Sequence, residues 1–581
     1  MDKFQKEIIK QLKKAGVKKE LAEGALDKPK KAELGDYAFP CFPLAKDWKK
    51  KPHEIAQDLA RKIPLSKEIV KIQVIGPFLN FFINKEEHSK DILTAIYKEK
   101  SKFGKGKEKK KIMVEFCSPN TNKPLHLGHV RNCVIGDSVS KILDFNGNKV
   151  TKSCLVNDRG VHICKSMLAY QKWGAKKLPD IKSDFYVGKF YVMFAKEAAK
   201  SEKKSEELEK EAQLMLQKWE KGDKATITLW KKMNSWVYKG FGETYKNLGV
   251  SFDKFYYESE MYKEGKDIIM GGLKKKIFEK DETGAVIVDL EKYKLPKKVL
   301  LRSDGTSLYI VQDLFLGKKK IEDFKLDQSI HVVGSEQKMH FDVLFKIFEL
   351  LGHKWAKNLY HLSYGMVYLP DGKMKSREGK IVDADDLVRE MKELARFSIK
   401  ERHKDLQEKE VDKRAEMIGL GAIKFFLLRT DFVKDIHYDP KESISFEGET
   451  GPYVQYTHAR ICSIMRKLAE ENKKSKNSEK FDAKFVKKVK YEVYDEREQE
   501  IIKMLGEFPI VVNASSKHLK PSIITRYLLD LSQKANEFYH ASPILKAPDD
   551  LLRARILLIH SVKQVIETGL GLLGIDAPQE M

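Results

Sequence analysis

The sequence contains no long apolar run. Across its 581 residues, no stretch approaches the ~18 consecutive apolar residues that a membrane-spanning helix needs. The opening segment MDKFQKEIIKQLKKAG spreads lysines through an amphipathic helical pattern and lacks the apolar core of a signal peptide. The sequence therefore predicts a protein without a membrane partner. A chain of this length divides into about three or four domains.

Cysteine is scarce and scattered. The six cysteines form no C-x-x-C pair, which argues against a disulfide framework or a zinc knuckle and favours reduced thiols in a cytoplasmic protein. Cys154, His162 and Cys164 offer metal-ligating atoms, but no fourth ligand follows at a suitable spacing. We therefore predict a packed helix face at these residues and no structural metal.

Negative charge is also in short supply. Lys and Arg number 110 against 85 Asp and Glu, which gives a formal net charge of +25. An excess of this size favours contact with a polyanion such as a nucleic acid. The alternative is a lysine-rich proteome, in which many of these side chains only solvate helices.

Changes in composition divide the chain into four parts. Residues 1–108 start with helical patterns and close with β-rich runs and a basic linker, KFGKGKEKKK. Residues 109–385 alternate strand-like and helical runs. Residues 386–450 form a helical connecting region, and residues 451–581 carry Leu, Ile and Val at the helical spacing of a bundle.

The second part has the order strand, loop, helix, strand. KIMVEFCSP predicts a buried strand, HVRNCVIGDSVSKILDFNG a helix, and NKVTKSCLVND another strand. This βαβ order predicts a parallel sheet with nucleotide chemistry at the strand ends. A charged helical insertion is predicted at about 166–266. The β-rich runs GAVIVDL, KVLLRS, SIHVVGS and YHLSYGMVYL then follow.

The stretch SPNTNKPLHLGHVRN links the first strand to the helix. His126 and His129 lie three residues apart near the expected helix start, where free N–H groups favour phosphate. Gly128 leaves the backbone open to a flat ligand, and Lys123 adds a positive charge. These residues suit a triphosphate that gathers charge as pyrophosphate leaves. Taken alone, two histidines at this spacing are more typical of partly buried helix residues, so the neighbouring residues must decide.

A second basic segment follows the run SYGMVYL. PDGKMKSREGK begins with an Asp-Gly turn and contains four basic residues, Lys373, Lys375, Arg377 and Lys380, with Gly379 as a hinge. Alone it is a solvated basic loop. Together with a histidine site, it predicts a lid that closes over ATP phosphates.

These motifs resemble a known family. PLHLGH is similar to the His-Ile-Gly-His signature of class I aminoacyl-tRNA synthetases, and GKMKSREGK is similar to their Lys-Met-Ser-Lys-Ser signature. Further segments along nearly the whole chain resemble arginyl-tRNA synthetases: VEFCSPNTNKPLHLGHVRN, VNDRG, SDGTSLYIVQDL, HVVGSEQKMHF, GPYVQYTHARI and LLGIDAPQEM. The resemblance implies a Rossmann-type α/β catalytic domain with the helical insertion. This domain stands between an N-terminal α+β tRNA-binding domain and a C-terminal all-α anticodon-binding bundle.

The resemblance implies arginine–tRNA ligation in two steps. L-arginine and ATP, the latter with Mg²⁺, form arginyl-adenylate and pyrophosphate, and the arginine then passes to the 3′-terminal ribose of tRNA(Arg). Activation in this family typically requires bound tRNA, and a monomer is expected. The implied catalytic residues are Lys123, His126, His129, Lys373 and Arg377. The implied ATP-binding residues are His126, Gly128, His129, Gly365, Met366 and Lys373.

One position departs from the general signature. Ser376 stands where the second lysine of the Lys-Met-Ser-Lys-Ser pattern is expected, whereas Lys373 matches the first. Arginyl enzymes that share this loss carry a lysine just before the histidine motif. Lys123 matches that lysine, so the resemblance implies that it compensates for the change at Ser376.

Arginine recognition calls for carboxylates, because a guanidinium is a planar fork of donors. The resemblance implies arginine contacts by Glu115, Asn120, Tyr309, Asp313 and Gln337, with Asp313 the first choice for the guanidinium. On the residues alone, Tyr309 and Asp313 are also an ordinary i, i+4 pair of one helix. The implied tRNA contacts are Asn80, Phe82, Tyr453, Tyr456, Arg460 and Met581.

Three other functions use parts of the same pattern. They are a tRNA-independent nucleotidyltransferase, a catalytically inactive RNA-binding relative and a class I synthetase for another amino acid. The long helical part after residue 385 argues against the first, and the presence of both histidines with Lys123 argues against the second. For a cysteine enzyme, the six cysteines are poorly spaced as zinc ligands.

Overall fold

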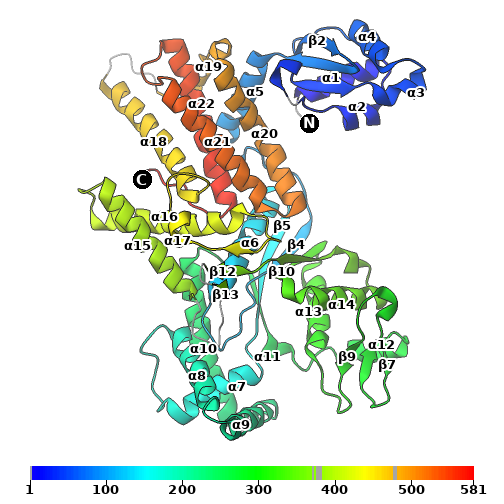
Figure 1. The fold of residues 1–581 in the computed structure, drawn as a ribbon, viewed down its shortest axis with the longest axis vertical. Helices are drawn as coiled ribbons and strands as arrows, with labels where there is room; N and C mark the ends of the chain where they lie inside the picture. The colour runs from blue at the N-terminus through cyan, green and yellow to red at the C-terminus, as the bar shows by residue number, and fades with distance from the viewer. Residues whose placement is uncertain (1–2, 30, 370–371, 374–381, 475–479) are drawn as a thin grey trace. The chain divides into compact units, whose positions relative to one another are not determined.

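The computed structural model describes residues 3–29, 31–369, 372–373, 382–474 and 480–581 (Figure 1). The chain forms two compact units, and each is described by itself. Unit 1 comprises Met1–Lys100, Lys467–Gly506 and Glu537–Val562. Unit 2 comprises Ser101–Arg466, Glu507–Asn536 and Lys563–Met581.

Unit 1 begins with a small α+β layer. Phe4, Ile8 and Leu12 recur at helical spacing on α1 (Lys3–Lys14) and share a buried core with Phe39 and Phe81. An antiparallel sheet has the order β1-β3-β2, with β1 (Tyr37–Pro40), β2 (Ile69–Ile75) and β3 (Phe78–Ile83). The neighbouring helices are α2 (Lys19–Ala25), α3 (Ala45–Trp48), α4 (Pro52–Lys62) and α5 (Lys85–Glu99). The predicted N-terminal α+β fold is confirmed.

The centre of unit 2 is a parallel five-stranded sheet with the order β11-β10-β4-β5-β6. Its strands are β4 (Lys111–Glu115), β5 (Lys149–Val156), β6 (Lys254–Tyr257), β10 (Gln328–Gly334) and β11 (Leu359–Tyr364). The chain runs outward from β4 to β5 and β6, then returns to the other side of β4 at β10. The order therefore reverses between β4 and β10, and ligands of such sheets bind beyond the carboxyl ends of the strands at this point.

Helices complete the crossovers of this sheet. The helix α6 (Leu127–Phe145) joins β4 to β5, and α14 (Lys338–Leu350) joins β10 to β11. Between β5 and β6 the chain forms α7 (Val161–Trp173), α8 (Ser183–Ala198), α9 (Glu202–Glu220) and α10 (Lys224–Asn247). The predicted insertion is therefore helical, although β6 lies within the range 166–266 and belongs to the main sheet.

The runs GAVIVDL and KVLLRS do not join the parallel sheet. They form β8 (Val286–Val288) and β9 (Lys298–Leu301), which pair with β7 (Glu279–Lys280) in a separate antiparallel sheet. The sequence pattern could not separate the two sheets, because a short buried strand has the same composition in both. The adjoining helices are α11 (Glu258–Met261), α12 (Lys266–Lys274) and α13 (Tyr309–Phe324).

After the sheet, the chain is mainly helical, as predicted. A small sheet of β12 (Val367–Leu369), β13 (Gly372–Lys373) and β14 (Ile436–His437) is the exception. The helices are α15 (Ala384–Arg402), α16 (Glu408–Arg429), α17 (Pro440–Ser443), α18 (Gly451–Lys474), α19 (Ala483–Lys487), α20 (Glu496–His518), α21 (Pro521–Ala541) and α22 (Asp549–Leu572). Within the described residues, no helix has the length and apolar content needed to cross a membrane.

Candidate active site

A recess of about 390 Å³ lies beyond the carboxyl ends of β4, β10 and β11. The segment after β4 contributes four of the predicted residues, and the segment after β11 contributes two. These six are Lys123, His126, Gly128, His129, Gly365 and Met366. The structure thus brings together residues more than two hundred positions apart, at the place where the strand order reverses.

The two histidines form the N-terminal cap of α6. His126 is the capping residue, and its Nδ1 accepts a hydrogen bond from the Gly128 N–H at 3.2 Å. The Nδ1 of His129 accepts from the His126 N–H at 3.2 Å, and the ring centroids lie 4.0 Å apart. A neutral ring whose Nδ1 accepts must carry its proton on Nε2. Each ring therefore offers an Nε2–H donor.

Burial keeps both rings neutral. It lowers the pKa of His126 to about 4, with a smaller contribution from the positive charge of Lys123. Burial, followed by His126 and Lys123, holds the pKa of His129 well below its usual value. Burial also lowers the pKa of Lys123. An anion bound among these three groups raises their pKa values and so favours their protonated, charged forms. A bound polyphosphate would therefore increase the positive charge of the recess.

Asn132, one turn further along α6, connects three strand ends. Its Oδ1 accepts from the Cys117 N–H at 2.5 Å, and its Nδ2 donates to the Val332 carbonyl at 2.8 Å and to Tyr364 Oη at 3.0 Å. Cys117 has a φ of 74°, a left-handed conformation that is strained for a side chain of this kind. Asn132 was not predicted, although its place three residues after His129 puts it on the same helix face.

Arg131 holds the segment beyond β11. The guanidinium is completely buried and donates to the carbonyls of Gly365, Met366, Phe432 and Lys434. Burial lowers the pKa of Arg131 to about 10, so it remains a cation at neutral pH. A Cβ on Gly365 would lie 2.6 Å from Lys434, which explains why glycine stands there.

The segment that follows the predicted lid adjoins the histidine motif. The Leu127 N–H donates to the Val382 carbonyl at 3.0 Å, and the Ala384 N–H donates to the Leu125 carbonyl at 2.9 Å. Lys373 belongs to β13 by its backbone, whereas its side chain lies outside what the structure describes. Arg377 and Ser376 also lie outside the described residues.

The predicted arginine residues lie on neighbouring segments at the same edge of the sheet. Tyr309, 66% exposed, begins α13, and the Oδ2 of Asp313 lies 2.8 Å from His340 Nε2. Asn120 is exposed after β4, and Gln337 is exposed shortly after β10. These four side chains are accessible to a small ligand.

Glu115 differs from these four. Its side chain is 6% exposed and forms an ion pair with Lys320, which is 1% exposed. His331 Nδ1 lies 3.2 Å from its second oxygen. Burial raises the pKa of Glu115, but Lys320 and His331 outweigh that effect and lower it to about 2. The structure therefore argues against Glu115 as a vacant carboxylate for arginine, because both oxygens already have partners.

Glu258, the first residue of α11, was missed by the sequence analysis. It is 6% exposed, and among the described residues its Oε1 has no hydrogen-bond partner. Burial raises its pKa to about 7; Arg159 lowers it, while Asp158 and Asp313 raise it. A buried carboxylate with an unused oxygen beside Asp313 suits a guanidinium. The sequence signal that could have identified Glu258 is its position directly after the β-rich run of Lys254–Tyr257.

Arg159, in the loop after β5, is held by residues of the helical insertion. It forms an ion pair with Glu220 of α9, and its guanidinium lies 4.2 Å from the centre of the Tyr262 ring. The helical insertion thus reaches the loop after β5. Arg159 remains close enough to Glu258 to influence its charge.

The predicted RNA residues fall into two groups. In β3, Asn80 is 2% exposed, whereas Phe82 is half-buried with Lys71 Nζ 4.6 Å from its ring centre. In α18, Tyr453 is half-buried and the Arg460 guanidinium lies 4.7 Å from the Tyr456 ring. All of these RNA contacts, that of Asn80 included, stay predictions.

Met581 belongs to a packed chain end. Its side chain adjoins a core of Ala395, Ile399 and Ile418, and its carbonyl oxygen lies 3.0 Å from His403 Nε2. His458 of α18 lies 2.8 Å from the Pro578 carbonyl. The end of the chain is thus held against α15, α16 and α18.

Three family models match consecutive parts of the chain. The catalytic domain of "tRNA synthetases class I (R)" matches residues 92–439, which is more than half of the chain. The "Arginyl tRNA synthetase N terminal domain" matches residues 2–83, and the "DALR anticodon binding domain" matches residues 454–581.

Whole-chain comparisons agree with these models. The arginine–tRNA ligase of Treponema denticola is 46% identical over 567 residues, covering 96% of this chain and 94% of the relative. That of Parabacteroides distasonis is 42% identical and covers 96% and 95%. The structure of Thermus thermophilus arginyl-tRNA synthetase aligns with a TM-score of 0.81 at 26% identity, over 99% of both chains. The chain belongs to the arginyl-tRNA synthetase family of class I enzymes, and its activity is that of an arginine–tRNA ligase.

Proposed function

We propose that the recess at His126 and His129 binds ATP and that the cluster at Tyr309, Asp313 and Glu258 binds arginine. Class I synthetases use ATP, so a triphosphate site is required. The observation that carries the proposal is the cap of α6, where two neutral rings offer Nε2–H donors beside Lys123. Donors fixed before the reaction stabilise developing charge without reorganising.

At the arginine end, we propose Asp313 as the main partner of the guanidinium. Glu258 supplies a second carboxylate, and the Tyr309 hydroxyl a further contact. Glu115 acts indirectly, by fixing Lys320 and the end of β4. Asn120 and Gln337, both accessible, suit the main-chain groups of arginine or the orientation of their neighbours.

The proposed chemistry requires little from the protein beyond position and charge. The arginine carboxylate attacks the α-phosphorus of ATP, the bond to the bridging oxygen breaks, and pyrophosphate leaves. His126, His129 and Lys123 neutralise the charge that gathers on the phosphates, with Lys373 and Arg377 reaching them from the lid. Mg²⁺ enters with ATP, since it is usually held through substrate phosphates. Gly128, Gly365 and Met366 border the adenosine.

The RNA-binding parts complete the proposal. The match to an anticodon-binding domain supports tRNA(Arg) binding by the C-terminal helices. Within them we propose contacts by Tyr453, Tyr456 and Arg460, with Met581 supporting the surface from its packed position, and Phe82 as an N-terminal contact. We also propose that bound tRNA is required for activation, that the enzyme is a cytoplasmic monomer, and that its parts divide at residues 108, 385 and 450.

ATP–pyrophosphate exchange tests these points together. Each amino acid is tested with and without tRNA(Arg), using the full chain and an α6-cap variant, His126→Ala. Exchange with arginine alone among the amino acids, and only when tRNA is present, is the expected result. Exchange without tRNA refutes the tRNA requirement, and an unchanged rate in His126→Ala refutes the proposed ATP site. Lys274→Ala, an exposed substitution on α12, is the control.

A further inference from the structure

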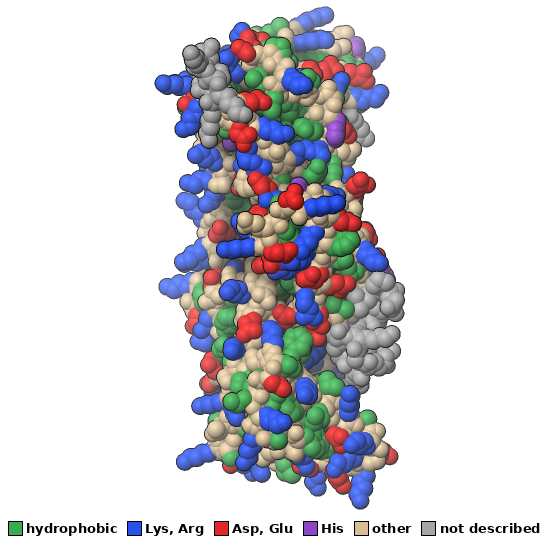
Figure 2. Space-filling model, turned by 90° about the vertical axis from the view of Figure 1, so that its left-hand side faces the viewer, with side chains coloured by type: hydrophobic (Ala, Val, Ile, Leu, Met, Phe, Trp, Pro, Cys, Tyr) green, Lys and Arg blue, Asp and Glu red, His purple; other side chains and the backbone are tan. Residues whose placement is uncertain are grey.

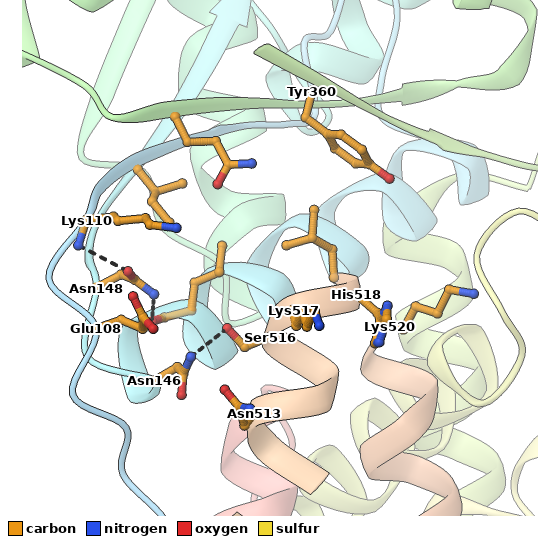
Figure 3. Close-up of a pocket in the computed structure, with 14 residues that line it drawn as sticks. Glu108, Lys110, Asn146, Asn148, Tyr360, Asn513, Ser516, Lys517, His518 and Lys520 are labelled. Atoms are coloured by element: carbon orange, nitrogen blue, oxygen red, sulfur yellow. Dashed lines mark hydrogen bonds between the residues drawn. The ribbon is translucent and has the colours of Figure 1, made fainter. Parts of the chain in front are cut away.

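A second recess in unit 2 lies at the opposite edge of the parallel sheet. Its volume is about 680 Å³, and the residues that line it are drawn in Figure 3. Ile112, Gln328 and Tyr360 line it, and they stand at the amino ends of β4, β10 and β11. The proposed ATP recess is at the carboxyl ends of the same strands, so the two recesses are separate. The steps of the ligation reaction make no use of this one.

One wall is formed by the segment that the sequence predicted to be a basic linker. The Gly106 N–H donates to the Phe145 carbonyl at 3.0 Å, and the Glu108 N–H to the Asn146 carbonyl at 3.0 Å. The buried Asn148 accepts from the Lys110 N–H at 3.2 Å, as Figure 3 shows. The segment is therefore held along the end of α6, and its lysines project from a fixed backbone.

The facing wall is the end of α20. Ser516 accepts a hydrogen bond from Asn146 Nδ2 at 3.1 Å, which joins the two walls. Leu519, which follows α20, is buried and has a φ of 55°. A left-handed backbone conformation is unfavourable for leucine, so the packing around the Leu519 side chain must hold the backbone in place. The backbones of the two walls are therefore held by hydrogen bonds and packing within the chain.

Several groups of this recess are not used by the fold. Lys110, Lys517 and His518 are exposed, and Tyr360 is 41% exposed. Within the part of the chain that the structure describes, the side chains of these four residues have no hydrogen bond or ion pair. Lys520 differs, because its Nζ lies 2.5 Å from Asp431. The recess thus combines unpaired cationic side chains with an accessible aromatic ring.

We propose that this recess binds a nucleotide. Lys110, Lys517 and His518 match a phosphate, and the ring of Tyr360 provides a stacking surface for a base. The amides of Gln328 and Asn513, which also line the recess, suit the polar edge of a base. The volume lies within the ~300–1,000 Å³ typical of small-ligand sites.

Lysines also occur near helix ends simply because they complement the helix dipole. That explanation covers Lys517 and His518 at the end of α20. It does not account for Lys110 on a different segment, for the exposed ring of Tyr360, or for an open recess between them. The combination of charge, ring and cavity is what distinguishes a nucleotide from other polar ligands.

The nucleotide has two possible sources, a free nucleotide or an unpaired nucleotide of tRNA, and only the second rests on the proposed function. Photo-crosslinking separates them. The full chain is irradiated with 8-azido-ATP in one arm and with a tRNA(Arg) transcript containing 4-thiouridine in the other, and the labelled peptides are mapped. We expect label on residues 108–110, Tyr360 or residues 513–520. Label from the transcript identifies RNA as the source, label from 8-azido-ATP alone identifies a free nucleotide, and no label there from either overturns the proposal.

Variants test whether the label depends on the recess. Tyr360→Ala and the double variant Lys110→Ala/Lys517→Ala should each lower labelling there about tenfold or more, since one stacked base contributes a comparable factor. Tyr360→Phe should retain it. Phe397→Ala on α15 and Lys274→Ala on α12 are exposed controls of matched type. Labelling unchanged in both test variants refutes the site. Arginine-dependent exchange by the unaltered chain tests the proposed function separately.

Discussion

Lys320→Met removes the cation that pairs with Glu115. Both residues are buried, and Lys320 also lies 5.6 Å from the centre of the Tyr256 ring. Methionine has a similar length and packs well in apolar surroundings. The substitution therefore mainly leaves the Glu115 carboxylate without its ammonium partner. Removing one member of a buried pair costs about 3–5 kcal/mol, because the remaining charge cannot be solvated.

This cost predicts a large fall in thermal stability. A domain of 150–250 residues loses ~2–4 °C of melting temperature per kcal/mol. The melting temperature of the domain that contains the parallel sheet should therefore fall by about 6–20 °C. Differential scanning calorimetry measures it. Lys319→Met is a matched control on the same helix: its partner Asp323 lies 3.0 Å away and both side chains are well exposed. Exposed pairs contribute about 0–1 kcal/mol, so the control should change little.

A double variant separates charge from packing. Glu115→Leu/Lys320→Met removes both charges and should recover most of the lost stability, because apolar residues of similar size can replace a buried pair. The reasoning is refuted if Lys320→Met melts within the range of the control. It is also refuted if Lys320→Met binds arginine tenfold more tightly, since that would identify Glu115 as an arginine ligand that Lys320 had blocked.

Three further substitutions test the proposed site. Lys123→Ala should lower the rate of pyrophosphate exchange far more than Lys375→Ala, and a rate equal to that of the unaltered enzyme contradicts the compensating role of Lys123. Asp313→Ala should raise the Michaelis constant for arginine about a hundredfold or more, because hydrogen bonds to charged groups contribute ~1.5–3 kcal/mol each; a change under threefold excludes the contact. Glu258 has a pKa of about 7, so its carboxylate takes up a proton below neutral pH and the Michaelis constant should rise from pH 8 to 6. In Glu258→Gln this constant should be about tenfold higher and nearly independent of pH, whereas an unchanged slope removes Glu258 from the site.

The histidine cap of the proposed ATP recess follows from local sequence. A strand, a proline-marked turn and a helix with one histidine as its N-cap and another at its third position define a cap whose hydrogen bonds come from nearby residues. The C-terminal helices were equally predictable, because their apolar spacing is local. Gly365 and Met366 came from the resemblance instead. Nothing in their own segment indicates that Arg131, 234 positions earlier, holds them.

The charged partners could not be predicted in this way. Lys320 is 205 positions from Glu115, and one lysine among many carries no sign of burial in the sequence. Tertiary contacts decide whether a carboxylate forms an ion pair within the protein or is available to bind a ligand. Asn132 is similar, because its three partners come from the ends of β4, β10 and β11, which meet only in the folded sheet.

Glu115 and Glu258 show how the structure sharpens a family resemblance. Both are acidic residues at the carboxyl end of a strand of the parallel sheet, and both are 6% exposed. Glu115 has partners on both oxygens and a pKa of about 2; Glu258 has an oxygen without a partner among the described residues and a pKa of about 7. A guanidinium gains most where a buried carboxylate lacks a counterion, and it gains nothing where a lysine already provides one. The second carboxylate for arginine is therefore expected at the end of β6, two strands from the motif that first indicated the site.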